Sequence, residues 1–136
     1  MIEIWIDGAA RPNPGTGGIG VVIRGDNWDY TISEACQGRV SNNQAEYKAL
    51  VRALSELVEN RIPTNHEILI FSDSEMLVEQ MCKRRQVARG GAYVPDYIQA
   101  MKLKLHFNNL SFQYIPREEN AEADMLASKG TRKKPL

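Results

Sequence analysis

Long apolar runs are absent from this sequence of 136 residues, and cysteine is scarce. The N-terminal segment has no basic stretch followed by an apolar one, so we expect neither a signal peptide nor a membrane span. The two cysteines, Cys36 and Cys82, lack metal-ligand spacing and are expected to be small apolar residues in a reducing, cytoplasmic compartment. A single disulfide between them stays open at this stage.

An excess of charge of either sign is also absent, because 17 lysines and arginines balance 17 aspartates and glutamates. A neutral total argues mildly against tight non-specific binding to nucleic acid. Two segments are nevertheless locally basic, either as binding surfaces or as an ordinary solvated helix end and a frayed tail. The first contains Lys83, Arg84, Arg85 and Arg89, and the second contains Lys129, Arg132, Lys133 and Lys134.

Hydrophobic periodicity divides the chain into strands and helices. Ser41 followed by Gln44 is a capping-box signature at the start of the first helix. Residues 11–18, rich in proline and glycine, are expected to form a loop. The predicted strands are 2–6, 19–23, 28–37, 67–71 and 110–115, and the predicted helices are about 42–58, 74–85, 95–105 and 118–128.

The length and the order of these elements predict one α/β domain over residues 1–130, followed by a basic C-terminal tail at 131–136. Three successive strands imply an antiparallel meander, and the two later strands, which alternate with helices, are expected to be parallel. We therefore expect a mixed five-stranded sheet covered by helices.

Four acidic residues stand where a surface carboxylate is not expected. Asp7 and Asp73 end apolar strand-like runs, and Glu46 and Asp124 lie on the apolar sides of predicted helices. Carboxylates that converge without basic partners repel one another unless cations lie between them. Hard divalent cations prefer oxygen ligands, so the pattern predicts a metal site suited to phosphoryl chemistry.

Each of the four residues also has an ordinary explanation to be weighed. Asp7 precedes a glycine and suits an Asx-turn, and Asp73 is well placed to cap the following helix. Glu46 and Asp124 have no basic residue three or four positions ahead, unlike Glu79, which is expected to pair with Lys83, so no intrahelical ion pair accounts for them. Because strand ends and helix starts meet at one edge of an α/β sheet, the four together favour a site.

Four segments of the chain together resemble the type 1 ribonucleases H. They are Ile6-Asp7-Gly8-Ala9 with the Asn13-Pro14-Gly15 loop, Ser41-Asn42-Asn43-Gln44-Ala45-Glu46, Phe71-Ser72-Asp73-Ser74, and Ile115 to Asp124. The resemblance covers about residues 2–128 and implies a ribonuclease H-like fold. It also implies an endonuclease that cuts the RNA strand of an RNA–DNA hybrid with two Mg²⁺ or Mn²⁺ ions, leaving 5′-phosphate and 3′-hydroxyl ends. In that interpretation the metal ligands are Asp7, Glu46, Asp73 and Asp124.

The resemblance also implies contacts between polar side chains and the substrate. Asn13, Asn42, Asn43 and Gln44 resemble the groups that read the minor groove of the hybrid, and Ser41 matches a position near a phosphate of the DNA strand. Neutral amides suit this task because they meet 2′-hydroxyls and base edges without selecting a sequence. The alternative is loop and helix-capping chemistry, above all for Ser41 and Gln44.

Two departures from the family pattern bear on the expected activity. Many members carry a histidine in the loop after the fifth strand, where this chain has Arg117, as in an archaeal-like branch. Arginine does not accept a proton, so Arg117 is expected to stabilise phosphate charge, unless it only forms a surface ion pair. The stretch 82–96 is too short for the basic handle of some members. We therefore expect weaker, more salt-sensitive substrate binding. We also expect a monomer and no separate N-terminal hybrid-binding domain.

Three other functions stay open at the level of sequence. One is a nuclease of the same superfamily that acts on a retroelement or junction substrate. Another is an inactive nucleic-acid-binding module, although such a module is expected to have lost a carboxylate. A metal-free ribonuclease would need a pair of acid–base histidines, and the only two, His66 and His106, have no supporting motif.

Overall fold

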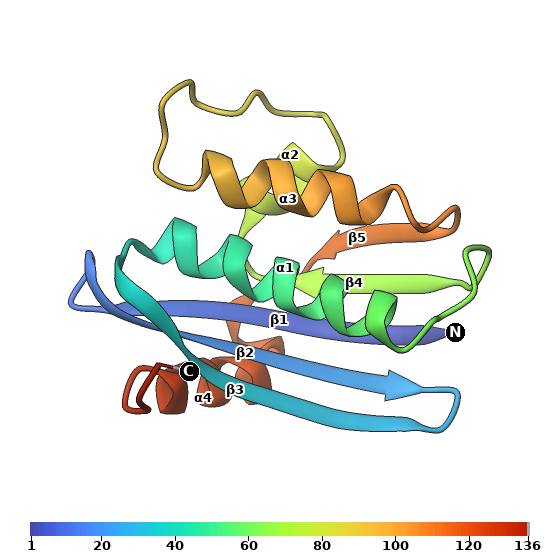
Figure 1. The fold of residues 1–136 in the computed structure, drawn as a ribbon, viewed down its shortest axis with the longest axis horizontal. Helices are drawn as coiled ribbons and strands as arrows, with labels where there is room; N and C mark the ends of the chain where they lie inside the picture. Colours follow the sequence, from blue (N-terminus) through green and yellow to red (C-terminus); the bar gives the residue numbers. More distant parts are fainter. Residues whose placement is uncertain (136) are drawn as a thin grey trace.

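A computed structural model of the chain describes residues 1–135, so Leu136, the end of the predicted tail, lies outside the described range. A five-stranded sheet with the strand order β3-β2-β1-β4-β5 runs through the molecule (Figure 1). The elements in chain order are β1 (Ile2–Arg11), β2 (Gly15–Gly25), β3 (Trp28–Val40), α1 (Asn42–Glu59), β4 (Ile68–Ser72), α2 (Glu75–Met81), α3 (Val94–Lys104), β5 (Leu110–Tyr114), a 3₁₀ turn η1 (Arg117–Glu119) and α4 (Ala121–Gly130).

The pairing of the strands confirms the predicted mixed sheet. β1, β2 and β3 form an antiparallel meander, whereas β4 pairs in parallel with β1 and β5 pairs in parallel with β4. The predicted end of the first strand at Ile6 is wrong, because pairing with β2 continues to Arg11 opposite Thr16. The predicted loop 11–18 is accordingly reduced to a turn at residues 12–14.

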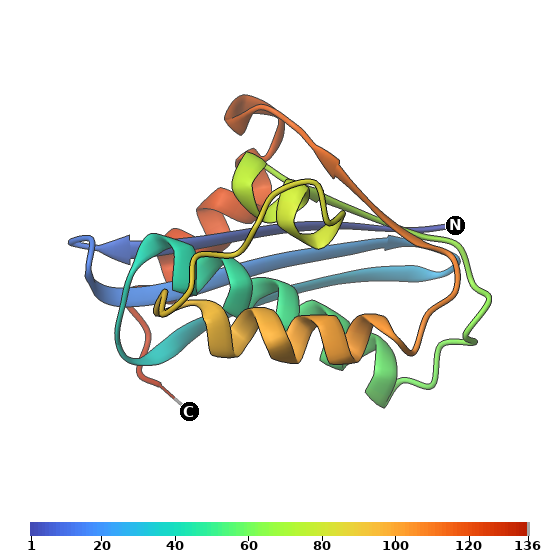
Figure 2. The same ribbon diagram turned by 90° about the horizontal axis from the view of Figure 1, so that it is seen from above.

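The helices form two layers around the sheet. α1 and α3 lie side by side over one face, and α4 lies on the opposite face (Figures 1 and 2). α2 joins the layer of α1, since the Tyr47 hydroxyl on α1 donates a hydrogen bond to Gln80 on α2. Within residues 1–135, no helix is both long and apolar enough to cross a bilayer.

The main core lies between the sheet and the layer of α1. Alternate residues of β1, including Ile4 and Ile6, are fully buried against Leu50 and Leu54 of α1. The alternate face of β1 carries Trp5, which packs against a smaller apolar cluster under α4. The two sides of β1 therefore face different helical layers, which fixes the register on which the acidic residues depend.

Two local predictions on this side of the molecule need correction. The second helix ends at Met81 and not near Arg85, because Lys83 adopts a left-handed backbone conformation with φ of 60°. Glu79, which the sequence pairs with Lys83 in an i,i+4 arrangement, bonds to Arg85 instead. Both cysteines are free thiols, Cys36 buried and Cys82 half-buried at the end of α2.

Candidate active site

The parallel pairing of β1 with β4 brings the first two carboxylates together. The pairing ends at Ile6 opposite Ser72, so Asp7 and Asp73 are the next residues of two neighbouring strands. Asp7 is only 4% exposed, although β1 continues beyond it in its pairing with β2. Both acids thus lie where the two parallel strands separate, as the strand-end argument requires.

Asp73 does not cap the following helix. The hydroxyl of Ser74 accepts the capping hydrogen bond from the Leu77 amide (3.2 Å), and the hydroxyl of Ser72 accepts one from the Ser74 amide (3.0 Å). The serines on either side therefore satisfy the start of α2. The Asp73 carboxylate is left available for the site.

Glu46 reaches the two aspartates because α1 packs directly on the backbone of β1. A Cβ atom at Gly8 would lie 2.2 Å from the carbonyl carbon of Ala45 and 2.4 Å from the nitrogen of Glu46, so only glycine allows this approach. One carboxylate oxygen from each of Asp7, Glu46 and Asp73 then lies within 4.8 Å of the other two. The three acids form one compact group.

Asp124 joins the site from the other face of the sheet. The backbone of α4 lies on Gly20 of β2, where an added Cβ would be 2.2 Å from the Ala123 carbonyl oxygen. The Asp124 side chain is 33% exposed and lies 3.8 Å from the Arg117 guanidinium, which is itself 75% exposed. Asp124 is therefore a rim residue beside the compact group, and not the core-facing acid that its sequence environment predicts.

A cavity of about 400 Å³ opens over these carboxylates. Polar and basic side chains from β1, α1 and η1 share its wall with the acids. The lining side chains with ionisable or amide groups are Asp7, Arg11, Asn42, Glu46, Asp73, Arg117 and Asp124. The predicted loop residue Arg117 thus lies at the same cavity as the acids.

The electrostatics of the group favour protonation unless positive charge is supplied. Burial, followed by the charge of Asp73, raises the pKa of Asp7 to about 8. Burial and the charge of Asp7 likewise raise the pKa of Glu46 well above its ordinary value, although a Gly8 backbone hydrogen bond opposes the shift. Burial also raises the pKa of Asp73. One oxygen of Glu46, Oε2, is buried and has no hydrogen-bond partner within residues 1–135.

Asn120 is a site residue that the sequence did not reveal. Its side chain is 1% exposed, and its Nδ2 donates a hydrogen bond to the Ile6 carbonyl (2.9 Å), directly before Asp7. A hydrogen bond from Asn120 to Asp73 partly offsets the raised pKa of that acid. The Asn120 carbonyl also accepts from the Asp124 amide (3.0 Å) in the first turn of α4. The Asn120 side chain thus connects the Asp7 and Asp73 segments and its backbone connects them to Asp124, whereas its place before a helix suggests only a cap.

Comparisons with known proteins agree with this arrangement. A family described as "Reverse transcriptase-like" matches residues 6–130. The crystal structure of LC11-RNase H1, isolated from compost by a metagenomic approach, in complex with an RNA/DNA hybrid is 35% identical, with a TM-score of 0.87 and 97% of each chain covered. The chain belongs to the type 1 ribonuclease H family.

Two further relatives are longer than this ribonuclease H chain, which covers only part of each. Ribonuclease HI of Halobacterium salinarum is 31% identical over 135 residues, which cover 93% of this chain and 62% of that protein. The bifunctional protein Rv2228c of Mycobacterium tuberculosis is 34% identical over 133 residues, which cover 93% of this chain. The chain spans about a third (34%) of the length of Rv2228c.

The start of α1 in this ribonuclease H chain carries four of the five predicted substrate residues, and three of them form side-chain hydrogen bonds within the protein. Ser41 and Gln44 form the predicted capping box, in which the Gln44 amide donates to the Ser41 hydroxyl (3.1 Å) and the Ser41 amide donates to the Gln44 Oε1 (2.8 Å). Asn42 accepts from the Ala10 amide (2.8 Å), which ties the turn to β1.

The remaining candidates lie on the open side of the same turn. The Asn13 Oδ1 accepts a hydrogen bond from the Asn42 amide (3.0 Å), so the turn between β1 and β2 is joined to the start of α1. Asn13, Asn42 and Asn43 are all exposed. Three amide side chains are thereby grouped beside the cavity, while Ser41 and Gln44 are committed to holding the helix start.

Proposed function

We propose that this chain is an endonuclease that hydrolyses the RNA strand of RNA–DNA hybrids and leaves 5′-phosphate and 3′-hydroxyl ends. The observation that carries the proposal is the compact group of Asp7, Glu46 and Asp73, which forms no ion pair within residues 1–135 and opens to solvent through a cavity. The hybrid bound to the LC11 relative supports the choice of substrate. A monomer in the cytoplasm, with a catalytic domain over 1–130 and a basic tail from 131, completes the proposal.

The donor set fits divalent cations. The oxygens come from carboxylates alone, and Glu46 keeps one of its oxygens buried without a hydrogen bond among the described residues. Such an oxygen is costly to bury unless a cation completes its coordination. We assign Asp7, Glu46, Asp73 and Asp124 as the residues that would hold two Mg²⁺ or Mn²⁺ ions. When bound, the ions would supply an activated water and a stabilised leaving oxygen.

The protein's own groups then have separate roles. Gly8 and Gly20 let α1 and α4 approach the sheet closely enough to fix Glu46 and Asp124. Arg117, exposed at the rim beside Asp124, stabilises negative charge on the substrate phosphate. Arginine does not accept a proton, so the proton of the attacking water would leave to bulk solvent, to the substrate phosphate, or to Glu118 or Glu119.

The exposed amides account for the choice of a hybrid duplex. Asn13, Asn42 and Asn43 form a neutral surface next to the acidic cavity. Neutral donors and acceptors of this kind suit 2′-hydroxyls and base edges in a wide minor groove. Ser41 and Gln44 contribute by holding the helix start, and Ser41 remains our candidate for a DNA-strand phosphate contact.

Cleavage assays with three substrates test the proposal. End-labelled RNA–DNA hybrid, RNA duplex and DNA duplex are each incubated with the protein in Mg²⁺, Mn²⁺ or EDTA. We expect cleavage of the hybrid RNA alone, in either metal but not in EDTA, and its loss in Glu46→Gln. Cleavage that persists in EDTA would contradict the metal assignment.

A second candidate follows from the family description, which refers to reverse transcriptases. A nuclease of the retroelement or junction type uses the same carboxylates on another substrate. Metal-dependent cutting of a four-way DNA junction, with no cutting of the hybrid, would favour this function. Binding of nucleic acid without cutting in either metal would leave an inactive binding module.

A further inference from the structure

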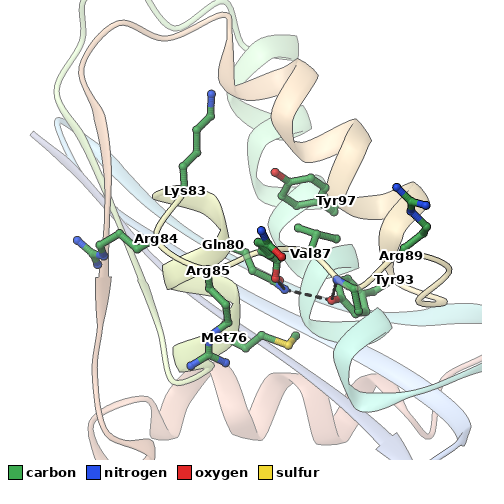
Figure 3. A pocket seen from close by; sticks show the side chains of 11 residues that line it. Met76, Gln80, Lys83, Arg84, Arg85, Val87, Arg89, Tyr93 and Tyr97 are labelled. Atoms are coloured by element: carbon green, nitrogen blue, oxygen red, sulfur yellow. Dashed lines mark hydrogen bonds between the residues drawn. The ribbon is translucent and has the colours of Figure 1, made fainter.

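Positive charge gathers on both faces of the sheet. On the face covered by α1, it follows the segment 82–93, which connects α2 to α3 and whose basic side chains line a cavity of about 800 Å³ (Figure 3). On the opposite face, it gathers at the end of α4. The cations there are Lys129, Arg132, Lys133 and Lys134. They belong to the basic stretch that the sequence also explains as a frayed tail.

The end of α4 is fixed to the sheet and is not frayed. A Cβ atom at Gly130 would lie 2.4 Å from the Glu34 carbonyl oxygen on β3, so helix and strand meet closely. Beyond the helix, the amides of residues 131–133 each donate a hydrogen bond to a backbone carbonyl of α4 (3.0–3.2 Å). The Lys133 Nζ donates to the Ser33 carbonyl on β3 (2.7 Å). The backbone that carries these cations therefore has a defined position as far as Lys133.

Arg11 connects the end of α4 to the carboxylate cavity. It is the last residue of β1, and it lines the cavity together with the acids. Its guanidinium donates a hydrogen bond to the Ser128 hydroxyl on α4 (2.7 Å). Ser128 follows Asp124 by four residues, so the two lie on the same side of the helix. This side of α4 therefore leads from a proposed metal ligand, past Arg11, to the basic end of the helix.

Five cations along this path have no acidic partner. All are exposed, and none forms an ion pair within residues 1–135. We call them the α4 basic surface, which consists of Arg11, Lys129, Arg132, Lys133 and Lys134. Acids on the neighbouring elements are bound to other arginines, Glu34 to Arg52 (3.1 Å) and Glu122 to Arg24 (2.8 Å). No acid of the described chain therefore neutralises this surface by direct contact.

Stabilisation of the helix end explains only part of this surface. Cations in the last turn of a helix interact favourably with the helix dipole, and Lys129 is such a residue. Arg11 comes from β1 and lies at the carboxylate cavity, where the dipole of α4 does not account for it. A group of exposed, unpaired cations suits a polyanion, and an arginine fork suits a phosphate group in particular.

We propose that the α4 basic surface contacts phosphates of the strand that is cut, next to the phosphodiester at the carboxylates, with Arg11 making the contact nearest to the cavity. The inference rests on the proposed function for the identity of that strand as RNA. A strand whose scissile phosphate lies at the acids, and which leaves the cavity past Arg11, meets the end of α4 next. Ser128 is a positioning residue, which holds the Arg11 guanidinium between the cavity and the helix end.

The salt dependence of binding tests the phosphate contacts. Each duplex phosphate contact contributes about 0.9 to the slope of log affinity against log salt, so Arg11→Gln/Arg132→Gln should reduce the magnitude of that slope by about 2. Fluorescence anisotropy of a labelled hybrid, with Ca²⁺ in place of Mg²⁺, gives the slope without a need for cleavage. Arg61→Gln/Lys102→Gln removes two exposed cations, one beyond the end of α1 and one on α3, and this matched control should keep the parent slope.

Neutral linkages identify the strand that the surface contacts. Two hybrids are compared, one with methylphosphonate linkages in the RNA strand and one with them in the DNA strand. The first lacks the charges that the surface is proposed to meet, so the parent protein and Arg11→Gln/Arg132→Gln should bind it with the same slope. With the second, the difference of about 2 between the two proteins should remain. The reverse result would assign the surface to the DNA strand and overturn the inference.

Steady-state kinetics on a hybrid test the positioning role of Ser128. Ser128→Ala leaves the Arg11 guanidinium without its hydroxyl partner, and we expect KM to rise about threefold with kcat within about twofold of the parent. Ser128→Thr keeps a hydroxyl and should restore the parent KM. In an Arg11→Gln background, Ser128→Ala should not change KM further, because the group that it positions is gone. An equal effect in both backgrounds would show that Ser128 does not act through Arg11.

The outcomes separate the inference from the proposed function. If the parent protein cleaves the hybrid while Arg11→Gln/Arg132→Gln keeps the parent slope, the inference is wrong and the cations serve only the end of α4. If the parent protein does not cleave the hybrid but the slope still falls by about 2, the proposed function fails and the phosphate-contacting surface stands.

Discussion

Two pairs of acidic residues at α1 differ in whether the fold gives them a basic partner. Near the end of the helix, Arg52 bonds to Glu34 on β3 (3.1 Å) and to Glu56 on α1 (2.6 Å). At its beginning, Glu46 faces Asp7 and has one oxygen without a hydrogen bond in the described chain. The same helix thus neutralises acids at one end with arginine and leaves them unneutralised at the other. Glu34 and Glu56 therefore have an internal basic partner, whereas Asp7 and Glu46 have none among the described residues, as the proposed cation site requires.

Removing one acid from the unneutralised pair should have the largest effect on activity. Asp7→Asn is expected to lower kcat/KM for a labelled hybrid by about 10³-fold or more, about 4 kcal/mol of transition-state stabilisation, because it removes a proposed cation ligand from the compact acidic group. Asp26→Asn, at the β2–β3 turn, is the matched control and should keep full activity. An Asp7→Asn protein that retained a tenth of the parent activity would contradict the assignment of Asp7 as a cation ligand.

Disturbing the orientation of the acids, without removing any, should have a smaller effect. Asn120→Ala leaves the Ile6 carbonyl and Asp73 without their donor, and we expect a loss of activity of about 10–100-fold. The Mg²⁺ concentration needed for half-maximal activity should rise at the same time, which a general loss of stability does not cause. Asn60→Ala removes a similar amide, bonded to the Glu56 carbonyl (2.8 Å), and should change neither quantity.

The pH dependence of stability tests, without a cleavage assay, whether the acids at the beginning of α1 lack an internal partner. Burial raises the pKa of Asp7 from 3.8 to about 8, so between these values the folded protein holds a proton that the unfolded chain has lost. Metal-free stability should therefore fall as pH rises through this window. We expect the melting temperature in EDTA to drop by about 5 °C or more from pH 5 to pH 9.

Two controls identify the source of this pH dependence. Asp7→Asn should make the profile in EDTA less steep, because it removes one of the three acids whose pKa is raised. Millimolar Mg²⁺ should raise the melting temperature most at high pH, where the carboxylates are ionised and bind cations best. A profile in EDTA that rose with pH in the parent protein would show that the acids are neutralised internally.

Breaking the neutralised pair should have the smallest effect on function. Arg52→Met leaves Glu34 and Glu56 without their shared donor, and we expect unfolding in urea to show a loss of about 1–3 kcal/mol. Specific activity of the folded protein should remain within about twofold, because the change lies far along α1 from Glu46. Loss of activity without loss of stability would mean that the two ends of the helix are coupled.

Local sequence patterns were enough to predict the architecture. Alternation along β1 and helical spacing along α1 are properties of neighbouring residues, and the capping box of Ser41 and Gln44 formed as expected. The lengths of strands and helices were harder to predict because they depend on partners. β1 runs on through Asp7 since β2 continues to pair with it, and α2 stops at Met81 because the chain turns to enter the segment 82–93.

The acidic residues were found by sequence, but their arrangement was not. Asp7 and Asp73 meet because of the register of two parallel strands, which no local pattern specifies. Asp124 lies at the rim because η1 and α4 approach from the other face of the sheet. Asn120 escaped notice because an asparagine before a helix normally caps it, and only the folded chain shows its side chain turned toward Ile6.

The contact between α4 and β2 has a consequence for the evolution of this chain. At Gly18 and Gly20, the backbones of strand and helix approach so closely that the strand has no room at these two positions for a side chain that could repack when a neighbour changes. In most protein cores, a substitution can be compensated by a change in a neighbouring side chain. At Gly18 and Gly20 no such compensation is available. In a library of single variants selected for function, these two positions should tolerate the fewest replacements, although neither carries a chemical group.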